Sequence, residues 1–350
     1  MSEHRISKLI IKWYNESKRE LPWRNISDPY RIWISEIILQ QTRVEQGLDY
    51  YLRFIERFPN VQSLAEAEED EVLKYWQGLG YYSRVRNLHA AARSIEVDFK
   101  GVFPKEYHEV RRLKGVGDYT AAAICSFAYN MPYSAVDGNV YRVLSRLFNV
   151  DLPIDGGKGK RLFADLAQQL LSKTNPATHN QAMMEFGARQ CVPKNPNCEK
   201  CPLQEICMAY SDGTIAKLPV KLQKTTVKNR YFNYFRIHLK DKIYLKKRTE
   251  NDIWRNLYEF PLIETAESLN FEQLSQTTEF KNLFHEIDQV EIRLIAADVI
   301  HILSHRRISA SFYEVYISNP NKTLNDYLEI IESDFDRYAV SRLIQLLVTH

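Results

Sequence analysis

Apolar residues recur at every third or fourth position through most of the first 215 residues of the chain. This spacing places apolar side chains on one face of a helix. It is clear in the segments RIWISEIILQQ, DEVLKYWQGLG, AAAICSFAY, VYRVLSRLF and RLFADLAQQLL. Glycine and proline separate these segments, as in ERFPN, LKGVGDY and NMPYS, and mark the turns between helices. The pattern predicts an almost entirely helical region over residues 1–215.

The hydrophobic pattern changes after residue 228. YFNYFRIHLKDKIYLKKR alternates and is rich in aromatic and β-branched residues, which is typical of strands. RLIAADVIHILSHRRISASFYEVYIS indicates a second hairpin, whereas DYLEIIESDF and RYAVSRLIQLLV indicate helices. We therefore expect a separate α+β domain over residues 229–350. The basic stretch 216–228, which has no acidic residue, is the predicted linker.

Composition and charge narrow the class of protein only slightly. Hydrophobic residues make up 45% of the chain and charged residues 26%, as in globular proteins. The net charge of +3 is too small to indicate nucleic-acid binding by itself. The first twenty residues are charged and amphipathic, and no run approaches the roughly 18 apolar residues of a membrane span. We expect a cytoplasmic protein that makes no membrane contact.

Four of the five cysteines crowd into seventeen positions, in the pattern C-x6-C-x2-C-x5-C. Four thiolates this close can bind an iron–sulfur cluster or a single tetrahedral zinc ion. Disulfides are disfavoured in an intracellular protein. Zinc sites usually contain two matched CxxC pairs, so the single pair here favours iron and sulfide. The predicted ligands are Cys191, Cys198, Cys201 and Cys207, and Cys125 is predicted to be an inert buried thiol.

The segment LKGVGDYTAAAI predicts a phosphate-binding turn. Gly115 and Gly117 flank Val116 and leave the backbone N–H groups unobstructed. A helix is expected to begin near Asp118, and the positive end of its dipole attracts anions. An ordinary packing corner between two helices is the alternative interpretation.

Two carboxylates lie in segments that suit acid–base chemistry. Glu36 lies within the apolar run RIWISEIILQQ, where burial would raise its pKa, unless this position faces solvent. Asp137 directly precedes a predicted helix, so capping N–H groups and the helix dipole would hold it ionised. An acid with a raised pKa beside an ionised carboxylate is the pair that glycosidic cleavage requires.

These motifs together resemble the endonuclease III superfamily of helix–hairpin–helix DNA glycosylases. The resemblance implies a [4Fe–4S] cluster that shapes a DNA-binding loop, here with Arg189 and Lys194, and takes no part in catalysis. WISEIILQQTRV and VDGNVYRVLSR resemble catalytic segments of the adenine glycosylase branch, MutY. They imply that Glu36 protonates the leaving base, and that Asp137, with Asn139 beside it, stabilises the sugar cation.

Position 119 distinguishes two reaction types within this superfamily. The bifunctional branch has a lysine there, which attacks the sugar and permits strand cleavage through a Schiff base. This chain has Tyr119, which cannot form that imine, so monofunctional base removal is expected. A bifunctional glycosylase/lyase is the alternative function. A noncatalytic DNA-binding scaffold is disfavoured because both carboxylates are present.

The resemblance also implies the residues that contact the substrate. Their spacing alone does not specify adenine, and tyrosines near position 81 could equally pack between helices. The residues implied to form the adenine pocket are Arg19, Trp23, Arg24, Leu39 and Gln181. Those implied to enter the duplex near the lesion are Gln41 and Tyr81.

The C-terminal region resembles Nudix-like domains through IWRNLYEFP, residues Ile253 to Pro261. The glutamate-rich helix that Nudix hydrolases need for metal is missing after this segment, which favours a reader domain over a hydrolase. In the MutY family a hairpin tip bearing Phe-Ser-His senses 8-oxoguanine. The matching residues here are Leu303, Ser304 and His305, of which Leu303 departs from the pattern. A generic loop histidine is the alternative interpretation of His305.

The predicted fold is therefore mainly α: a helix–hairpin–helix glycosylase with a [4Fe–4S] cluster loop and a C-terminal α+β Nudix-like domain. Residues 24–135 are expected to form the helix–hairpin–helix module, and 1–23 with 136–215 the iron–sulfur module. The expected reaction hydrolyses the N-glycosidic bond of adenine opposite 8-oxoguanine or guanine, leaving an abasic site. The expected partner is double-stranded DNA, and the protein is expected to be a monomer. No motif is evident over 262–295.

Overall fold

A computed structural model describes residues 3–222 and 226–348. The chain folds into two compact units, which are residues 1–66 with 87–223, and residues 67–86 with 224–350. Residues 223–225, within the predicted basic linker, lie outside the described residues.

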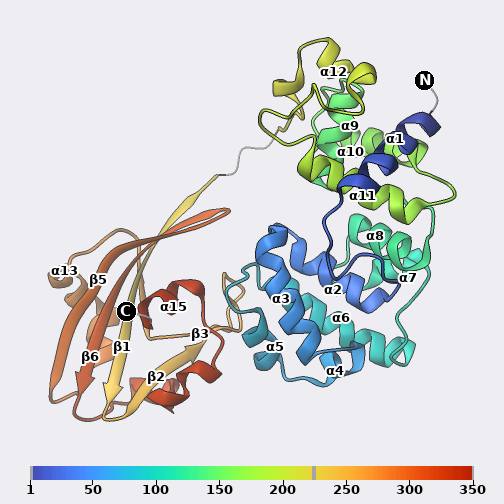
Figure 1. Cartoon of the computed structure of the whole chain (residues 1–350). Helices are drawn as coiled ribbons and strands as arrows, with labels where there is room; N and C mark the ends of the chain where they lie inside the picture. Colours follow the sequence, from blue (N-terminus) through green and yellow to red (C-terminus); the bar gives the residue numbers. More distant parts are fainter. Residues whose placement is uncertain (1–2, 223–225, 349–350) are drawn as a thin grey trace. The chain divides into compact units, whose positions relative to one another are not determined.

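The first unit is helical, as the hydrophobic spacing predicts (Figure 1). Its helices before the cysteine loop are α1 (Glu3–Ser17), α2 (Pro29–Leu39), α3 (Val44–Arg57), α4 (Val61–Glu66), most of α6 (Ser83–Phe99), α7 (Tyr107–Arg112), α8 (Asp118–Tyr129), α9 (Gly138–Leu147), α10 (Gly157–Leu170) and α11 (Pro176–Arg189). The loop after α11 carries the cysteines and contains short helices, η1 (Gln204–Ile206), α12 (Met208–Ser211) and η2 (Ile215–Lys217). The prediction of a helical region over 1–215 is confirmed.

Local signals in the sequence fix where the site-bearing helices begin. The Asp28 side chain accepts hydrogen bonds from the backbone N–H groups of Tyr30 and Arg31, and Pro29 opens α2. Asp137 caps α9 by accepting from the Val140 N–H at 2.8 Å. Helix α8 packs against α2 and α11, and α11 also packs against α9. This packing brings together the ends of four helices that are distant in sequence.

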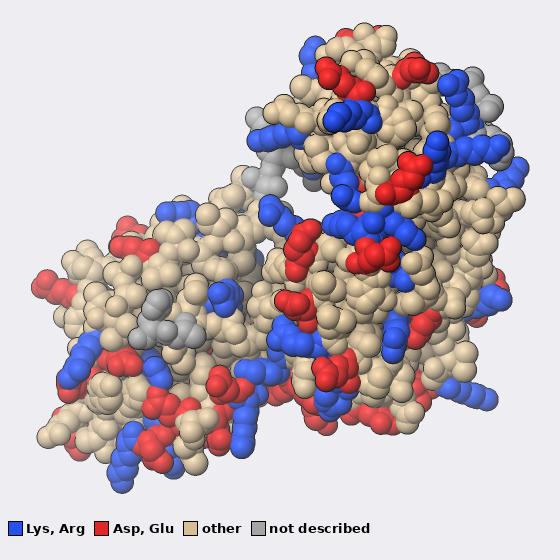
Figure 2. All heavy atoms as spheres, viewed as in Figure 1, with Lys and Arg blue, Asp and Glu red and all other residues tan. Residues whose placement is uncertain are grey.

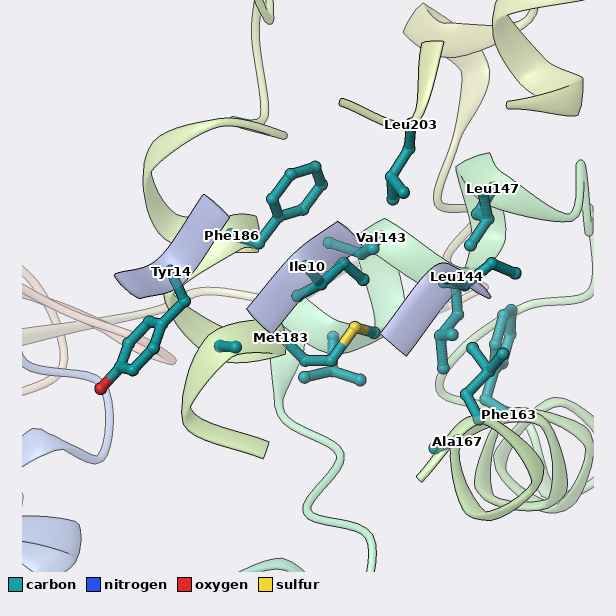
Figure 3. Close-up of a cluster of buried hydrophobic side chains, with 14 of the residues drawn as sticks. Ile10, Tyr14, Val143, Leu144, Leu147, Phe163, Ala167, Met183, Phe186 and Leu203 are labelled. Atoms are coloured by element: carbon teal, nitrogen blue, oxygen red, sulfur yellow. The ribbon is translucent and has the colours of Figure 1, made fainter. Parts of the chain in front are cut away.

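One hydrophobic core joins the first helix of the chain to helices more than 120 residues later (Figure 3). Ile10 and Tyr14 of α1 pack with Leu144 of α9, Phe163 of α10 and Phe186 of α11. Each of these side chains is almost fully buried, and each buried apolar side chain contributes about 1.5–3 kcal/mol relative to exposure. Leu203, from the cysteine loop, belongs to the same cluster. The loop is therefore packed onto the helices that carry the site.

The second unit is built on one twisted sheet (Figure 1). The strands are β1 (Lys228–Leu239), β2 (Lys242–Lys247), β3 (Tyr258–Glu259), β4 (Leu262–Thr265), β5 (Val290–Leu303), β6 (Arg306–Ile317) and β7 (Leu328–Ile331). The main path is β3-β2-β1-β6-β5, with β4 on β1 and β7 on β2. Strands β1 and β6 are parallel, and the other pairs are antiparallel. Both predicted hairpins, β1–β2 and β5–β6, are confirmed.

Helices cover one face of this sheet and complete the second unit. Phe235 of β1 and Tyr313 of β6 stack at 5.1 Å, and they pack with Leu274 and Leu283. The short helices of the unit are α5 (Glu69–Trp76), α13 (Phe271–Ser275), α14 (Thr278–Phe284), η3 (Thr323–Asp326), η4 (Glu332–Arg337) and α15 (Arg342–Val348). The segment 262–295, which shows no sequence motif, thus supplies β4 and the helices that bury this face.

The helix predicted for DYLEIIESDF is wrong in its first half. Leu328–Ile331 is strand β7, which pairs with β2 and places Ile330 opposite Ile243. Within β7 only Ile330 is buried, whereas Leu328, Glu329 and Ile331 are exposed, so the backbone pairing with β2 and not a burial pattern defines the strand. Pairing with the edge of the sheet overrides the local pattern, and only a 3-10 turn, η4, follows.

The face of the molecule shown in Figure 2 carries charges of both signs. On the face shown in Figure 2, basic and acidic side chains are interspersed. This agrees with the net charge of +3. Among the helices that the structure describes, none is both long enough and apolar enough to cross a membrane.

Candidate active site

A cavity of about 460 Å³ in the first unit gathers all of the residues predicted for catalysis and base binding. Its walls come from α2, α8, α9 and α11, together with the segments that flank α2. The predicted residues that line it are Arg19, Trp23, Arg24, Glu36, Leu39, Gln41, Tyr119, Asp137, Asn139 and Gln181. Side chains as far apart in sequence as Arg19 and Gln181 therefore face one space.

Glu36 is a buried carboxyl group in the wall of this cavity. Its side chain is 6% exposed, so it does not face solvent as the alternative interpretation required. Burial raises the pKa of Glu36 to about 7, opposed by a hydrogen bond from Tyr119 and aided by the charge of Asp137. The Tyr119 hydroxyl donates to Glu36 Oε2 at 2.6 Å. At neutral pH a large fraction of this carboxyl group therefore carries a proton.

Asp137 combines the capping position with a second hydrogen bond. Its Oδ1 accepts from the Val140 N–H at 2.8 Å and its Oδ2 from the Asn139 amide at 2.7 Å. Capping was expected to hold this carboxyl group ionised, but burial, which that expectation left out, raises the pKa of Asp137 above its ordinary value. The hydrogen bonds from Val140 and Asn139 and the charge of Arg142 oppose that rise. The dipole of α9 also favours the charged form.

Tyr119 is the only titratable side chain that donates directly to Glu36 among the described residues. Burial raises the pKa of this phenol well above its ordinary value, so it remains a proton donor at neutral pH. No lysine is among the described residues that line the cavity. The amine chemistry of the bifunctional branch therefore has no side chain here to perform it.

Glu185 is a site residue that sequence reasoning missed. Its carboxylate is 1% exposed and receives Arg19 Nε at 2.8 Å, Arg19 Nη2 at 2.7 Å and Arg24 Nη2 at 2.6 Å. Burial would raise the pKa of Glu185, but these two arginines lower it to about 2. Glu185 lies four residues after Gln181 on α11, which is the helical spacing that places both on one face. That spacing was the available signal.

A buried arginine connects the catalytic end of α9 to the cysteine loop. Arg142 Nη2 donates to Asn139 Oδ1 at 2.8 Å and to the Gly187 carbonyl at 2.6 Å. Its Nε donates to the carbonyl of Cys191 at 2.7 Å. A side chain at Gly187 would put its Cβ 2.6 Å from the Cβ of Asn139, so glycine permits this close approach of α9 and α11. A charged residue in an apolar helix was the only sequence signal for Arg142.

The four predicted cysteine ligands are free thiols, all partly buried. The other three lie close enough to Cys201 to act on it electrostatically. Arg146 Nη1 donates to Cys191 Sγ at 3.4 Å, which suits a thiolate. Among the residues that the structure describes, no three ligand-type side chains are spaced for a single metal ion. Four cysteine thiolates are the donors that a four-iron cluster takes, so the chemistry of this donor set fits it.

The backbone of the predicted phosphate-binding turn, residues 115–117, has the glycine conformation and the helix start that were expected. Gly115 has φ +80°, and a Cβ there would lie 2.7 Å from the Cβ of Asn87, so only glycine fits. Val116 is buried beneath the turn, and Arg111 donates to its carbonyl at 2.9 Å. Gly117 is the N-cap of α8, and a Cβ there would meet no atom within 4 Å. The turn thus leads into a helix whose N-terminus carries the positive end of the dipole.

The remaining predicted DNA contacts lie in the second unit. Tyr81 has φ +47° and a side chain that is 45% exposed. Its hydroxyl lies 2.5 Å from Ser304 Oγ. Ser304 and His305 form the two-residue turn between β5 and β6, and Leu303 is the last residue of β5. The structure therefore brings two of the predicted lesion contacts together, although they are 223 positions apart.

Three family profiles match successive parts of the chain. The profile of the HhH-GPD superfamily base excision DNA repair proteins matches residues 34–169. That of the iron–sulfur binding domain of endonuclease III matches 191–207, and that of the NUDIX domain matches 233–350. The profile over 191–207 spans the four cysteines, and the [4Fe–4S] prediction is confirmed.

Two relatives that are similar over most of the chain are both adenine DNA glycosylases. The adenine DNA glycosylase of Buchnera aphidicola subsp. Acyrthosiphon pisum is 35% identical over 268 residues, which cover 76% of this chain and 77% of that protein. The adenine DNA glycosylase of Schizosaccharomyces pombe is 30% identical over 406 aligned positions, covering 97% of this chain and 87% of that protein. The chain belongs to the adenine DNA glycosylase family. As an adenine DNA glycosylase, it acts in base excision repair of mispaired adenine.

Solved structures agree with this fold for the helical region of the adenine DNA glycosylase. A thermostable thymine-DNA glycosylase has a TM-score of 0.55 and 28% identity, covering 60% of this chain and 97% of that one. An endonuclease III in a non-covalent DNA complex has a TM-score of 0.52 and 22% identity, covering 61% of this chain and 98% of that one. The second likeness shows the fold alone. The predicted fold class of the enzyme is confirmed.

Proposed function

We propose that this enzyme hydrolyses the N-glycosidic bond of adenine opposite 8-oxoguanine or guanine, and leaves an abasic site in an intact strand. The observation that carries the proposal is the pairing of two unlike carboxyl groups in one cavity. Glu36 has a pKa raised to about 7 by burial, and Asp137 receives two hydrogen bonds at the start of a helix. These are the acid and the anion that glycosidic cleavage requires.

Glu36 is the proposed general acid. The bond between adenine and the sugar breaks more easily when a proton reaches the base, because the base then leaves as a neutral molecule. A protonated Glu36 is available at neutral pH, and the Tyr119 hydroxyl at 2.6 Å fixes the orientation of the carboxyl group. General acid catalysis of this kind typically contributes about 10²–10⁴-fold to the rate.

Asp137 is the proposed stabiliser of the sugar cation. Breaking the bond leaves positive charge on the sugar, and a carboxylate lowers the energy of that charge most effectively where water is excluded. The Asn139 amide donates a hydrogen bond to Asp137 Oδ2, and Arg142 in turn donates one to the Asn139 oxygen. These two hydrogen bonds fix the orientation of the Asp137 carboxylate. Attack by water on the cation then completes hydrolysis, and the proton that the water loses passes to the deprotonated Glu36. The strand stays intact because, among the described residues that line the cavity, no lysine is placed to form an imine.

The arginines around Glu185 and the amide of Gln181 are the proposed adenine pocket. Gln181 Oε1 accepts from the Tyr14 hydroxyl at 2.8 Å, which turns the amide group to one orientation. Arg24 Nη1 donates to the Arg19 carbonyl at 2.7 Å in addition to its contact with Glu185. Side chains whose rotamers are fixed in this way lose little freedom when a flipped base binds.

The cysteine loop is proposed to position DNA-binding residues. Cys191, Cys198, Cys201 and Cys207 would hold the [4Fe–4S] cluster, which supplies structure to the loop in this reaction. Arg146 donates to the carbonyls of Val192 and Pro193 at 2.8 and 2.9 Å and so orders the loop next to Lys194. We propose that the glycines of the turn at 115–117 bind a second part of the phosphate backbone.

The turn at Ser304 and His305 is the proposed reader of the opposite base. Oxidised guanine differs from guanine by a carbonyl at C8 and a proton on N7. A hydroxyl and an imidazole can each donate or accept, so they can distinguish these groups. A contact of this kind typically carries about 1–3 kcal/mol of discrimination. We propose that the enzyme does this as a monomer in the cytoplasm.

The function is tested with duplexes that contain adenine opposite 8-oxoguanine, guanine or thymine. The expected products from the first two are free adenine and a strand that breaks only after hot alkali. The duplex with thymine is the matched control and should release almost no adenine. Strand breakage without alkali would contradict the monofunctional reaction, and equal release from all three duplexes would contradict recognition of the opposite base.

A further inference from the structure

The loop between β2 and β3 contains one carboxylate that three arginines share. Asp252 Oδ2 accepts from Arg230 at 2.5 Å and from Arg248 at 3.1 Å, and its Oδ1 lies 3.3 Å from Arg306. The side chain of Asp252 is 23% exposed. Partly buried charges interact more strongly than pairs in open water. Asp252 therefore connects its own loop, which also carries Arg248, to β1 and β6.

The three arginines are held to different degrees. Arg248 also donates to both carboxylate oxygens of Glu259, at 2.8 and 2.7 Å. Arg230 also donates to both oxygens of Glu264, at 2.6 Å each. Within 3–222 and 226–348, Arg306 has no acidic partner other than Asp252. Loss of Asp252 thus removes the only ion pair that Arg306 makes with a described residue, while the other two arginines keep a carboxylate.

Arg306 is the residue that directly follows the turn at Ser304 and His305. It opens β6 and pairs across the hairpin with Leu303. The backbone N–H of Lys228 donates to the carbonyl of His305 at 3.0 Å. The turn is thus held from the backbone on one side and through the Arg306 side chain on the other.

A ring contact supports the same end of the hairpin. Trp254, two residues after Asp252, lies 5.8 Å from the ring of His301 on β5. Trp254 also packs against Phe232 of β1, with ring centroids 6.2 Å apart. These residues belong to the segment whose sequence resembles Nudix-like domains but lacks the hydrolase helix. In this chain the segment supports the hairpin.

We propose that Asp252 and Arg306 are positioning residues for recognition of the base opposite adenine. The inference rests on the proposed role of the turn at Ser304 and His305. In the sheet that the structure describes, β5 is the edge strand, so its side of the hairpin tip is not held by a further strand. The ion pair between Asp252 and Arg306 fixes the tip, so Ser304 and His305 meet the base in one geometry and lose little freedom on binding. The selectivity of binding depends on this pair, whereas the chemical step in the other unit does not.

The test compares single-turnover excision by the full-length enzyme over a range of enzyme concentrations. For each variant this yields a half-saturating concentration and a maximal rate, with adenine opposite 8-oxoguanine and opposite guanine. Arg306→Met and Asp252→Asn should each lower the ratio of the two half-saturating concentrations by roughly three- to tenfold. The maximal rates should stay within about twofold. Arg306→Lys, which keeps the charge, should restore part of the ratio.

Matched variants separate positioning from general damage. Arg293→Met removes an exposed arginine, paired with Glu291 at 2.6 Å, from the other end of β5, and it should leave the ratio unchanged. The double variant Asp252→Asn, Arg306→Met should lose no more than either single variant, because both changes break one contact. Because the Arg306 side chain is one-third exposed, its replacement should be tolerated by the fold. Arg306→Met therefore still tests the proposal if Asp252→Asn does not fold.

The double variant Ser304→Ala, His305→Ala distinguishes a failure of the positioning role from a failure of the reader role. If that change lowers the ratio while Arg306→Met leaves it at the wild-type value, the positioning role is wrong and the reader role stands. If Ser304→Ala, His305→Ala leaves the ratio unchanged, the reader role is wrong, and the positioning role falls with it. A fall in maximal rate without a change in the ratio, or no restoration by Arg306→Lys, also overturns the positioning role.

Discussion

At the scale of single residues, the cavity gives two carboxyl groups different surroundings. The apolar residues around Glu36 exclude water from its carboxyl group, which accepts a hydrogen bond from the Tyr119 hydroxyl. Asp137 is also buried but receives hydrogen bonds from Val140 and Asn139. The apolar run around Glu36 predicts its burial. The capping position of Asp137 is equally visible in the sequence, but its burial is not, because the groups that cover it come from other helices.

The pH dependence of excision tests the role of Glu36. A protonated acid is required, and the pKa of Glu36 is about 7, so the single-turnover rate should fall as the pH rises through 7. The hydrogen bond from Tyr119 lowers the pKa of Glu36 by stabilising its charged form. Tyr119→Phe should therefore move this falling limb to higher pH. A limb that stays in place or moves to lower pH would show that another group sets it.

Covalent trapping tests the role of Tyr119 in the reaction type. Borohydride reduces an imine between an enzyme amine and the sugar, and so links protein to DNA. The wild-type enzyme should give no adduct with adenine opposite 8-oxoguanine, because no described lysine lines the cavity. Tyr119→Lys provides the positive comparison, since it places an amine beside Glu36. An efficient adduct with the wild-type enzyme would assign it to the bifunctional branch.

At the scale of elements, the cysteine loop and the catalytic end of α9 are connected. Arg142 contacts Asn139 at one end and the Cys191 carbonyl at the other. The spacing of the cysteines predicts the metal site, and the profile match confirms it. The connection is not visible in the sequence, because it depends on how closely α9 approaches α11 at Gly187. Strand β7 could not be predicted from the local sequence either, because its partner β2 lies more than 80 residues earlier.

Replacing one ligand tests this connection. Cys198→Ser should lose iron, visible absorption and DNA binding together, because the loop loses its cluster. Excision by the remaining folded protein should fall as well, since Arg142 then loses an ordered carbonyl at Cys191. Cys125→Ser is the matched control, because this buried thiol lies outside the cluster and its loss should leave the iron content unchanged. Zinc without iron in protein purified without oxygen would contradict the cluster.

At the scale of the whole molecule, the sequence predicts the helical region and the C-terminal α+β domain, but it does not predict how segments are shared between the compact units. Residues 67–86 group with the C-terminal residues, where Asp70 accepts from Tyr258 at 2.9 Å and pairs with Lys247 at 2.5 Å. These polar contacts lie between residues more than 170 positions apart, so no local pattern indicates them. The proximity of Tyr81 to Ser304 could not be predicted either, because the two residues are 223 positions apart.

The most direct test of the account is single-turnover excision by Glu36→Gln on a duplex with adenine opposite 8-oxoguanine. The amide keeps the size of the side chain but cannot supply the proton. We expect wild-type binding of the duplex and a maximal rate of adenine release about 10²–10⁴-fold lower. Glu56→Gln, at an exposed glutamate of α3, is the control and should keep the wild-type rate. A rate for Glu36→Gln within a few fold of wild type would contradict the proposed acid and the cavity as the place where adenine is released.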